Sequence, residues 1–367
     1  MFTKFHTFTF FPTLYWSHTF ERPQELIYRF AQVIKRKIQI IQPLGLVKYP
    51  LLSKETIAKI FTKIKSSKSR YNNERILDNM TFVKCVYLHR FDSFSTKFNI
   101  AQLNRKLDLG KNNFFWASYI NPVIYSVFKK SMFKIIDLAE RRQANPQLSA
   151  AMKDLERRAV SEADLVIVDN VATVEDYKDV TSNIHYLPQG YDHTMFKKPQ
   201  NSQRSKIGYI GNLRYNAIDY GYLFDLIELN QDKTFLFVGG ILDSDAKQLS
   251  KYGNVEMAGV VSKDQLQKYL NQMIFGLIPY KKNEFTSGIF PTKLFEYLGA
   301  YVPVISTGIP EVLKYENDRF IFILDRPCHI EFKPDLEGLE TFLKGNTWDD
   351  RVEEYLGHIK HRCDSLI

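Results

Sequence analysis

The hydrophobic positions of this chain follow two patterns, short apolar runs and longer stretches with an apolar residue at every third or fourth position. The runs predict buried strands and the stretches predict amphipathic helices. Residues 5–11 predict a first strand and residues 38–41 a second strand. Within the stretch 16–31 between them, a helix is predicted to start at Pro23. Strand, helix, strand is how a doubly wound parallel sheet begins. We therefore expect an α/β fold with ligands beyond the carboxyl ends of its strands.

The alternation continues, is interrupted once, and then resumes. Further strands are predicted at 81–88, 113–119, 133–137, 163–168, 183–187, 206–211, 235–240 and 275–280, and a final amphipathic helix at 348–360. The interruption is a polar stretch after Phe196 that contains Pro199 and lacks periodicity, which is typical of a linker. We expect a first domain at 1–196, a second at 206–345 and a C-terminal helix within 346–367.

The stretch 284–311 reads as loop, helix, buried strand and loop, and carries the strongest chemical signal. Ser287, Gly288 and Pro291 mark the loop, and Pro291 is predicted in the first helical turn. A helix start directs free N–H groups and a positive dipole at a ligand such as phosphate. Thr292 and Lys293 add a hydroxyl and a charge there. Glu296 can accept hydrogen bonds from sugar hydroxyls. The alternative is an ordinary helix start with Glu296 in solvent.

Composition narrows the class of protein. A chain of 367 residues with 44% hydrophobic content can form two ordinary cores. The three cysteines are scattered and show no CxxC, so the sequence predicts neither a disulfide framework nor a zinc site. The N-terminus alternates like a strand and lacks the apolar core of a signal peptide, and no run is long enough to span a membrane. We expect a cytoplasmic protein.

Positive charge is concentrated in the first half, where residues 1–185 hold 29 Lys and Arg against 17 Asp and Glu. Such an excess attracts nucleic acid, an anionic membrane or an acidic glycan. Residues 53–70 combine a helical apolar stripe with Lys and Arg. They predict either an interfacial helix on an anionic membrane or a surface helix packed on the first domain. The sequence has no zinc spacing or RNA-binding signature, so we expect no nucleic acid partner.

The 284–311 stretch, with Ala-Asp-Leu-Val at 163–166 and Pro-Gln-Gly-Tyr-Asp at 188–192, resembles the bacterial group 1 nucleotide-sugar glycosyltransferases. It is closest to their teichuronic-acid and polysaccharide branch. The resemblance implies the glycosyltransferase-B fold, in which two Rossmann-like domains face a central cleft and the C-terminal helix crosses back. It also implies retaining, metal-independent transfer from a UDP- or GDP-sugar, with no other cofactor. The acceptor would be a glycan or lipid-linked precursor at the inner membrane face.

The family pattern also assigns roles to positions of this chain. It implies diphosphate contacts along 287–292, a ribose contact at Glu296 and a nucleobase contact near Val261. The other implied residues are Gly211, Asn212 and Arg214 for the donor, His18 and Asp137 for catalysis, and Arg22, Glu140 and Arg141 on the acceptor side. Ordinary alternatives remain: His18 packed on Trp16, Asp137 as a helix cap and Arg214 at the surface.

Two departures from the family pattern leave a second interpretation open. Gly288 stands where many members carry a first glutamate, and no lysine follows Arg214 at the family position. A catalytically silent partner with this fold is therefore one alternative function. A polyanion- or nucleic-acid-binding protein, suggested by the positive charge of residues 1–185, is the other. Asp243 and Asp245 form an Asp-x-Asp pair between a strand and a helix, where we expect capping rather than metal binding.

Overall fold

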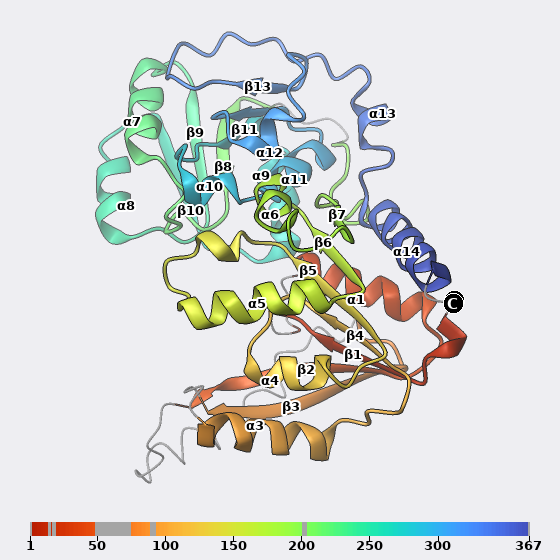
Figure 1. The fold of residues 1–367 in the computed structure, drawn as a ribbon. Coiled ribbons are helices and arrows are strands. Elements are labelled where there is room, and N and C mark those ends of the chain that lie inside the picture. Colours follow the sequence, from red (N-terminus) through yellow and green to blue (C-terminus); the bar gives the residue numbers. More distant parts are fainter. Residues whose placement is uncertain are drawn as a thin grey trace. The chain divides into compact units, whose positions relative to one another are not determined.

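The computed structural model describes residues 2–13, 16, 20–47, 75–88, 93–199 and 204–365, and the chain divides into two compact units. The first unit comprises Met1–Asp169, Thr173–Leu187 and Val352–Ile367. The second comprises Asn170–Ala172 and Pro188–Arg351. Each is built on one parallel sheet connected by helices (Figure 1). The chain therefore returns to the first unit through its last helix.

A seven-stranded parallel sheet with the order β3-β2-β1-β4-β5-β6-β7 forms the first unit. Its elements are η1 (Phe2–Lys4), β1 (Thr7–Phe11), α1 (Arg22–Val33), β2 (Ile38–Val47), β3 (Met80–Leu88), α3 (Ser93–Lys106), β4 (Asn113–Ala117), α4 (Pro122–Phe128), β5 (Phe133–Leu138), η4 (Arg142–Ala144), α5 (Ala150–Glu162), β6 (Leu165–Val168), α6 (Val171–Tyr177), β7 (Ile184–Tyr186) and most of α14 (Trp348–Ser365). In Figure 1, α3 runs alongside the edge strand β3. The strands predicted from the apolar runs are confirmed.

The central strands of this sheet are buried on both faces. All five residues of β1 and of β4 are buried, and the hydroxyls of Thr7 and Thr9 each donate a 2.9 Å hydrogen bond to the side-chain oxygen of Asn113. The rings of Phe8 and Phe114 are in tilted contact with centroids 5.3 Å apart, and Phe5 packs edge-on to both. These aromatic contacts hold β1 against β4 in the middle of the sheet.

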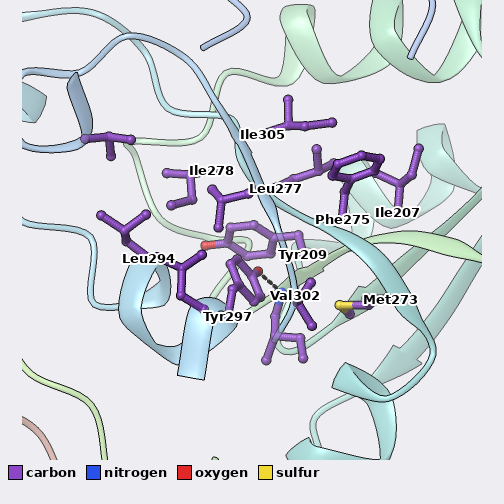
Figure 2. Close-up of a cluster of buried hydrophobic side chains, with 14 of the residues drawn as sticks. Ile207, Tyr209, Met273, Phe275, Leu277, Ile278, Leu294, Tyr297, Val302 and Ile305 are labelled. Atoms are coloured by element: carbon purple, nitrogen blue, oxygen red, sulfur yellow. Dashed lines mark hydrogen bonds between the residues drawn. The ribbon is translucent and has the colours of Figure 1, made fainter. Parts of the chain in front are cut away.

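The second unit repeats the design with a six-stranded parallel sheet in the order β10-β9-β8-β11-β12-β13. Its elements are β8 (Lys206–Ile210), α7 (Tyr220–Leu229), β9 (Thr234–Val238), α8 (Asp243–Leu249), β10 (Val255–Gly259), η5 (Lys263–Gln265), α9 (Leu266–Leu270), β11 (Met273–Ile278), α10 (Glu284–Ser287), α11 (Lys293–Gly299), β12 (Val304–Ser306), α12 (Pro310–Leu313), β13 (Ile321–Ile323) and α13 (Leu339–Leu343). Figure 2 shows part of its core, where Tyr209 and Tyr297 lie among aliphatic side chains.

Three local predictions need correction. The helix expected to contain Pro291 in its first turn begins at Lys293, with Thr292 as its N-cap. The loop expected before it contains one helical turn, α10, because Asn283 and Thr286 cap each other's backbone. Asp243 does not cap α8: the N-cap is Leu242, and Asp243 and Asp245 lie in the first turn. Carboxylates there still complement the helix dipole.

Residues 53–70 lie outside the part of the chain that the structure describes, so the membrane-helix prediction stays a prediction. Within the described residues, no helix is both long enough and apolar enough to cross a membrane.

Candidate functional site

The strand order places a ligand-binding edge in the second unit between β8 and β11. The chain moves outward in one direction through β9 and β10 and in the other through β12 and β13. In doubly wound sheets, ligands bind at the carboxyl ends of the two strands where this direction reverses. The loops that leave those two ends contain most of the predicted donor residues, with Gly211 and Arg214 after β8 and residues 287–292 after β11.

Glycine backbone forms the floor of this edge. Gly211 has φ +144° and Gly239 has φ +137°, conformations that side-chain-bearing residues rarely adopt. A Cβ on Gly239 would lie 1.8 Å from the Gly211 carbonyl oxygen, so the turns after β8 and β9 meet at backbone contact. A Cβ on Gly211 would lie 2.4 Å from Cε of Lys293. Glycine at position 239 therefore leaves room for the Gly211 carbonyl. Glycine at position 211 leaves room for the Lys293 side chain, which crosses the end of β8.

Lys293, the first residue of α11, brings a cation to this floor. Its ammonium nitrogen lies 5.3 Å from the centroid of the Tyr209 ring, within cation–π range. Burial opposes the charged form, but Tyr280 and Glu296 outweigh it and raise the pKa of Lys293 above its ordinary value. Lys293 therefore stays protonated across the physiological range. It is a fixed positive charge at the end of β8.

A buried hydroxyl faces the same turn. Tyr209 is fully buried, and its hydroxyl oxygen would lie 3.4 Å from a Cβ on Gly211. Among the described residues, nothing meets this hydroxyl with ordinary hydrogen-bond geometry, although Tyr280 lies next to it. Buried polar groups without partners are rare and call for an explanation. A bound anion at the Gly211 turn would supply the missing partner.

The side chains of Thr292 and Glu296 are also available to a ligand. Both are half-buried. Thr292 is the N-cap of α11, yet its hydroxyl makes no capping bond. In the described part of the chain, no hydrogen bond or ion pair engages the Glu296 carboxylate. One helical turn therefore presents a cation at Lys293 and an acceptor at Glu296.

Arg214 and Asn212 lie in the loop after β8 and are exposed. The Arg214 guanidinium donates a 3.1 Å hydrogen bond from Nε to the carbonyl of Ile241, which holds it beside the loop after β9. The Asn212 side-chain oxygen accepts from the Arg214 backbone N–H at 3.1 Å. Asn212 thus shapes the turn that carries Arg214.

The remaining donor-side predictions fall around this edge. Ser287 ends α10, and its hydroxyl donates to the carbonyl of Glu284 at 2.7 Å. Gly288 is buried and caps α10 at φ −101°, a value open to any residue. Pro291 is buried, and its carbonyl accepts from the Leu294 N–H. Val261 follows β10 and is half-buried against the core.

In the first unit, the structure brings together two predicted residues as a buried pair. The Arg22 guanidinium donates to both carboxylate oxygens of Asp137, at 2.8 and 3.2 Å, and to the carbonyl of Leu187 at 3.0 Å. Both side chains are almost fully buried. Burial disfavours the charged guanidinium, but Asp137 reverses this and raises the pKa of Arg22. Asp137 lies inside β5, so the helix-cap alternative is wrong.

The other acceptor-side predictions lie near the surface of the first unit. Glu140 is exposed just after β5. Arg141 forms a bidentate ion pair with Asp176, with N–O distances of 2.8 and 2.9 Å.

The predicted catalytic residue His18 lies outside the described residues. No group of three or more His, Cys, Asp or Glu side chains among the described residues is arranged to hold a metal ion.

Comparison with known proteins finds a family match in the second unit and a partial match to one curated relative. Residues 204–328 match the family described as Glycosyl transferases group 1. This part of the chain, which lies in the second unit, is similar to the group 1 glycosyltransferases. It is 24% identical over 193 residues to TuaH of Bacillus subtilis (strain 168), assigned to teichuronic acid biosynthesis as a glycosyltransferase. That match covers 46% of this chain and 48% of TuaH, so the chain spans about half the length of this relative.

Solved structures show the fold of this chain. A glycosyltransferase from Rickettsia africae superposes with a TM-score of 0.66 at 12% identity, covering 98% of this chain and 99% of the other. HepE from Anabaena, in complex with UDP and glucose, gives 0.61 at 10% identity and covers 99% of both chains. The two Rossmann-like domains form the glycosyltransferase-B fold, as predicted.

Sequence reasoning identified Gly211 and Lys293 but did not predict that they touch. It also missed Tyr209, Tyr280 and Tyr297, which surround the lysine. The sequence does carry one signal for this contact, the Gly239-Gly240 pair at the end of the predicted strand 235–240. Glycines at the ends of two neighbouring strands, here Gly211 and Gly239, indicate that the two backbones approach each other closely.

Proposed function

We propose that this chain transfers a glycosyl group from a nucleoside-diphosphate sugar to a glycan or lipid-linked acceptor in cell-surface polysaccharide biosynthesis. The donor would bind at the β8–β11 edge of the second unit, and the acceptor in the first domain. One observation carries the proposal: Lys293 lies against the Gly211 backbone, one turn of α11 from the Glu296 carboxylate, which has no hydrogen bond or ion pair among the described residues. The UDP and glucose bound to HepE and the assignment of TuaH support the choice of substrate class.

The chemistry follows from where charge develops. As the bond to the sugar breaks, negative charge accumulates on the departing diphosphate oxygens. Fixed cations at that place stabilise the transition state more than the ground state. Lys293 and Arg214 supply this positive potential, the Tyr209 hydroxyl donates a hydrogen bond, and Glu296 accepts from the ribose hydroxyls. Since the protein provides these charges itself, we expect transfer to persist in the presence of EDTA.

The finer assignments rest on the family pattern and on charge. We expect UDP or GDP as the nucleotide and retention at the anomeric carbon. The basic residues of 1–185 would favour an anionic acceptor, or an acceptor embedded in an anionic membrane at its cytoplasmic face. Reaction with a pure donor, followed by NMR of the new linkage, determines the anomeric configuration directly.

Thermal denaturation with a panel of UDP-, GDP-, ADP- and CMP-sugars tests the donor site. A ligand at 100 times its Kd that binds only the folded chain adds about 2.7 kcal/mol of stability. We expect one nucleotide class to raise the midpoint and the others to leave it unchanged. Glu296→Gln should reduce this shift. Glu316→Gln removes an exposed carboxylate in the same unit and should leave the shift intact.

The alternative, a silent partner, is tested by incubating the chain with acceptors and the donor that shifts the midpoint, and measuring hydrolysis and transfer. Gly288 in place of the usual glutamate is its strongest argument. A chain that binds the nucleotide sugar but hydrolyses or transfers none of it with any supplied acceptor would favour this alternative. A chain that binds no nucleotide sugar would overturn the donor site itself.

A further inference from the structure

Two large aromatic side chains are exposed at the β8–β11 edge. Tyr215 is 36% exposed and Phe285 is 45% exposed. Their ring centroids lie 5.9 Å apart with the planes at 64°. Together they form a corner with two accessible ring surfaces, which we call the aromatic corner (Tyr215 and Phe285). Most other aromatic residues described in this unit pack into its core.

The corner is rigid because its two loops are tied together. Tyr215 belongs to the loop after β8, and Phe285 to α10, after β11. The Asp219 N–H donates to the Pro279 carbonyl at 2.8 Å, and the Lys281 N–H donates to the Ala217 carbonyl at 2.7 Å. These bonds flank a bridge between the two segments. The exposure of the two rings is therefore a feature of fixed backbone.

The turn that carries Phe285 is also fixed from within. Asn283 accepts a 3.0 Å hydrogen bond from the Thr286 N–H, and the Thr286 hydroxyl accepts from the Asn283 N–H at 3.1 Å. The buried Thr286 hydroxyl in turn donates to the Lys281 carbonyl. This turn buries a threonine and exposes the phenylalanine beside it. Ordinary packing would favour the reverse, and the fixed turn keeps this ring at the surface.

The aromatic corner adjoins the donor residues. Arg214 immediately precedes Tyr215, and Ser287 and Gly288 follow Phe285 within the chain. The Tyr215 ring lies 6.1 Å from the ring of Tyr280, the residue that helps to raise the pKa of Lys293. The ring of Tyr280 thus lies between Lys293 and the aromatic corner.

Sheet topology decides which part of a nucleotide sugar meets the corner. The predicted nucleobase contact, Val261, follows β10, at one edge of the sheet. The order β10-β9-β8-β11 separates it from the corner, which follows β8 and β11. With the diphosphate at Gly211, Lys293 and Arg214, and the base at Val261 as the family pattern implies, the base would lie towards β10. The opposite end of the ligand, the sugar, lies towards β11.

We propose that the aromatic corner stacks against the pyranose ring of the nucleotide sugar and contributes to sugar specificity. Aromatic faces carry a negative quadrupole, and the C–H groups on one face of a pyranose carry partial positive charge, so the two surfaces attract each other. Sugars differ in which face presents such C–H groups, so the corner discriminates among epimers. This inference rests on the proposed function, because it requires a diphosphate at Lys293.

Calorimetric titration of the full chain with UDP, UDP-glucose, UDP-galactose, GDP and GDP-mannose tests it. The variants are Tyr215→Leu and Phe285→Leu, which keep apolar bulk but remove the ring. We expect unchanged affinity for the free nucleoside diphosphate and a roughly 3- to 10-fold weaker affinity for its sugar ester. The ring-retaining variants Tyr215→Phe and Phe285→Tyr should restore that affinity. Leu229→Ala, an exposed apolar residue at the end of α7, is the control and should change neither.

The possible results distinguish failure of the sugar-stacking role from failure of the proposed donor site. Equal losses for UDP and UDP-glucose in Phe285→Leu would place the ring against the base or the diphosphate loop and overturn the inference. Unchanged affinities in both leucine variants would overturn it as well, with the donor site intact. If the wild-type chain binds none of the five ligands, the proposed donor site fails and the corner's role fails with it. Thermal midpoints of the variants confirm that each is folded.

Discussion

The hydroxyl oxygen of Tyr297 accepts a 2.9 Å hydrogen bond from the backbone N–H of Ile210. Ile210 is the last residue of β8, and Tyr297 belongs to α11. The Tyr297 ring covers Gly276, where a Cβ would lie 2.5 Å from the ring. Burial raises the pKa of Tyr297 far above its ordinary value, so the hydroxyl keeps its proton. This contact fixes α11 on the sheet and thereby fixes Lys293 beside Gly211.

Removing that hydroxyl should both destabilise the second unit and disturb the site. In Tyr297→Phe the buried Ile210 N–H loses its acceptor, which costs about 1–3 kcal/mol. We expect a lower thermal midpoint and weaker binding of the nucleotide identified in the donor panel. Tyr252→Phe is the matched control, since the half-buried Tyr252 hydroxyl has no hydrogen bond among the described residues. An unchanged midpoint in Tyr297→Phe would refute the anchoring role.

Gly211→Ala should displace Lys293. The new Cβ would meet Cε of Lys293 at 2.4 Å, and φ +144° is strained for alanine. If the ammonium holds the diphosphate, losing that charge-assisted contact costs about 1.5–3 kcal/mol, or roughly 10- to 150-fold in affinity. Gly253→Ala, where a Cβ meets nothing within 4 Å, should bind normally. Normal binding by both variants would remove Lys293 from the site. Calorimetry with the panel's nucleotide measures both.

The apolar pattern predicted this fold well because burial on both faces of a parallel sheet leaves a direct mark on the sequence. It could not predict which buried polar groups meet, because those partners are distant along the chain. Ile210 and Tyr297 are 87 residues apart, and Arg22 and Asp137 are 115 apart. The exposed aromatic corner was missed for the same reason. Tyr215 and Phe285 look like ordinary apolar positions until the two loops are placed together.

Asp137→Ala should destabilise the first unit strongly. The change leaves the Arg22 guanidinium buried without its counter-charge, which typically costs about 3–5 kcal/mol. The double variant Arg22→Met with Asp137→Leu removes both charges and should recover most of the lost thermal midpoint. Transfer activity of the double variant then separates two roles. Recovered stability with no activity would support a functional role of the Arg22–Asp137 pair, and recovery of both would make the pair structural.

Thiol labelling should distinguish the three free cysteines. Burial raises the pKa of Cys85 and of Cys363 to about 11, so neither forms much thiolate near neutral pH. Cys328 is exposed. We expect one cysteine per native chain to react rapidly with Ellman's reagent, and all three after denaturation. Cys328→Ser should abolish the rapid phase, and rapid reaction of two thiols in that variant would contradict the burial of Cys85 and Cys363.

Acid should weaken the first unit through His185. The ring of His185 in β7 lies 4.2 Å from that of His358 in α14. Burial, followed by the charges of His358 and His361, lowers the pKa of His185 below its ordinary 6.5. As the pH falls below that value, the unfolded chain takes up the proton before the folded chain does, so stability is lost. Thermal midpoints measured from about pH 8 to about pH 5 should therefore fall less steeply in His185→Gln than in the wild type. A parallel decline in the two proteins would show that other groups control the acid response.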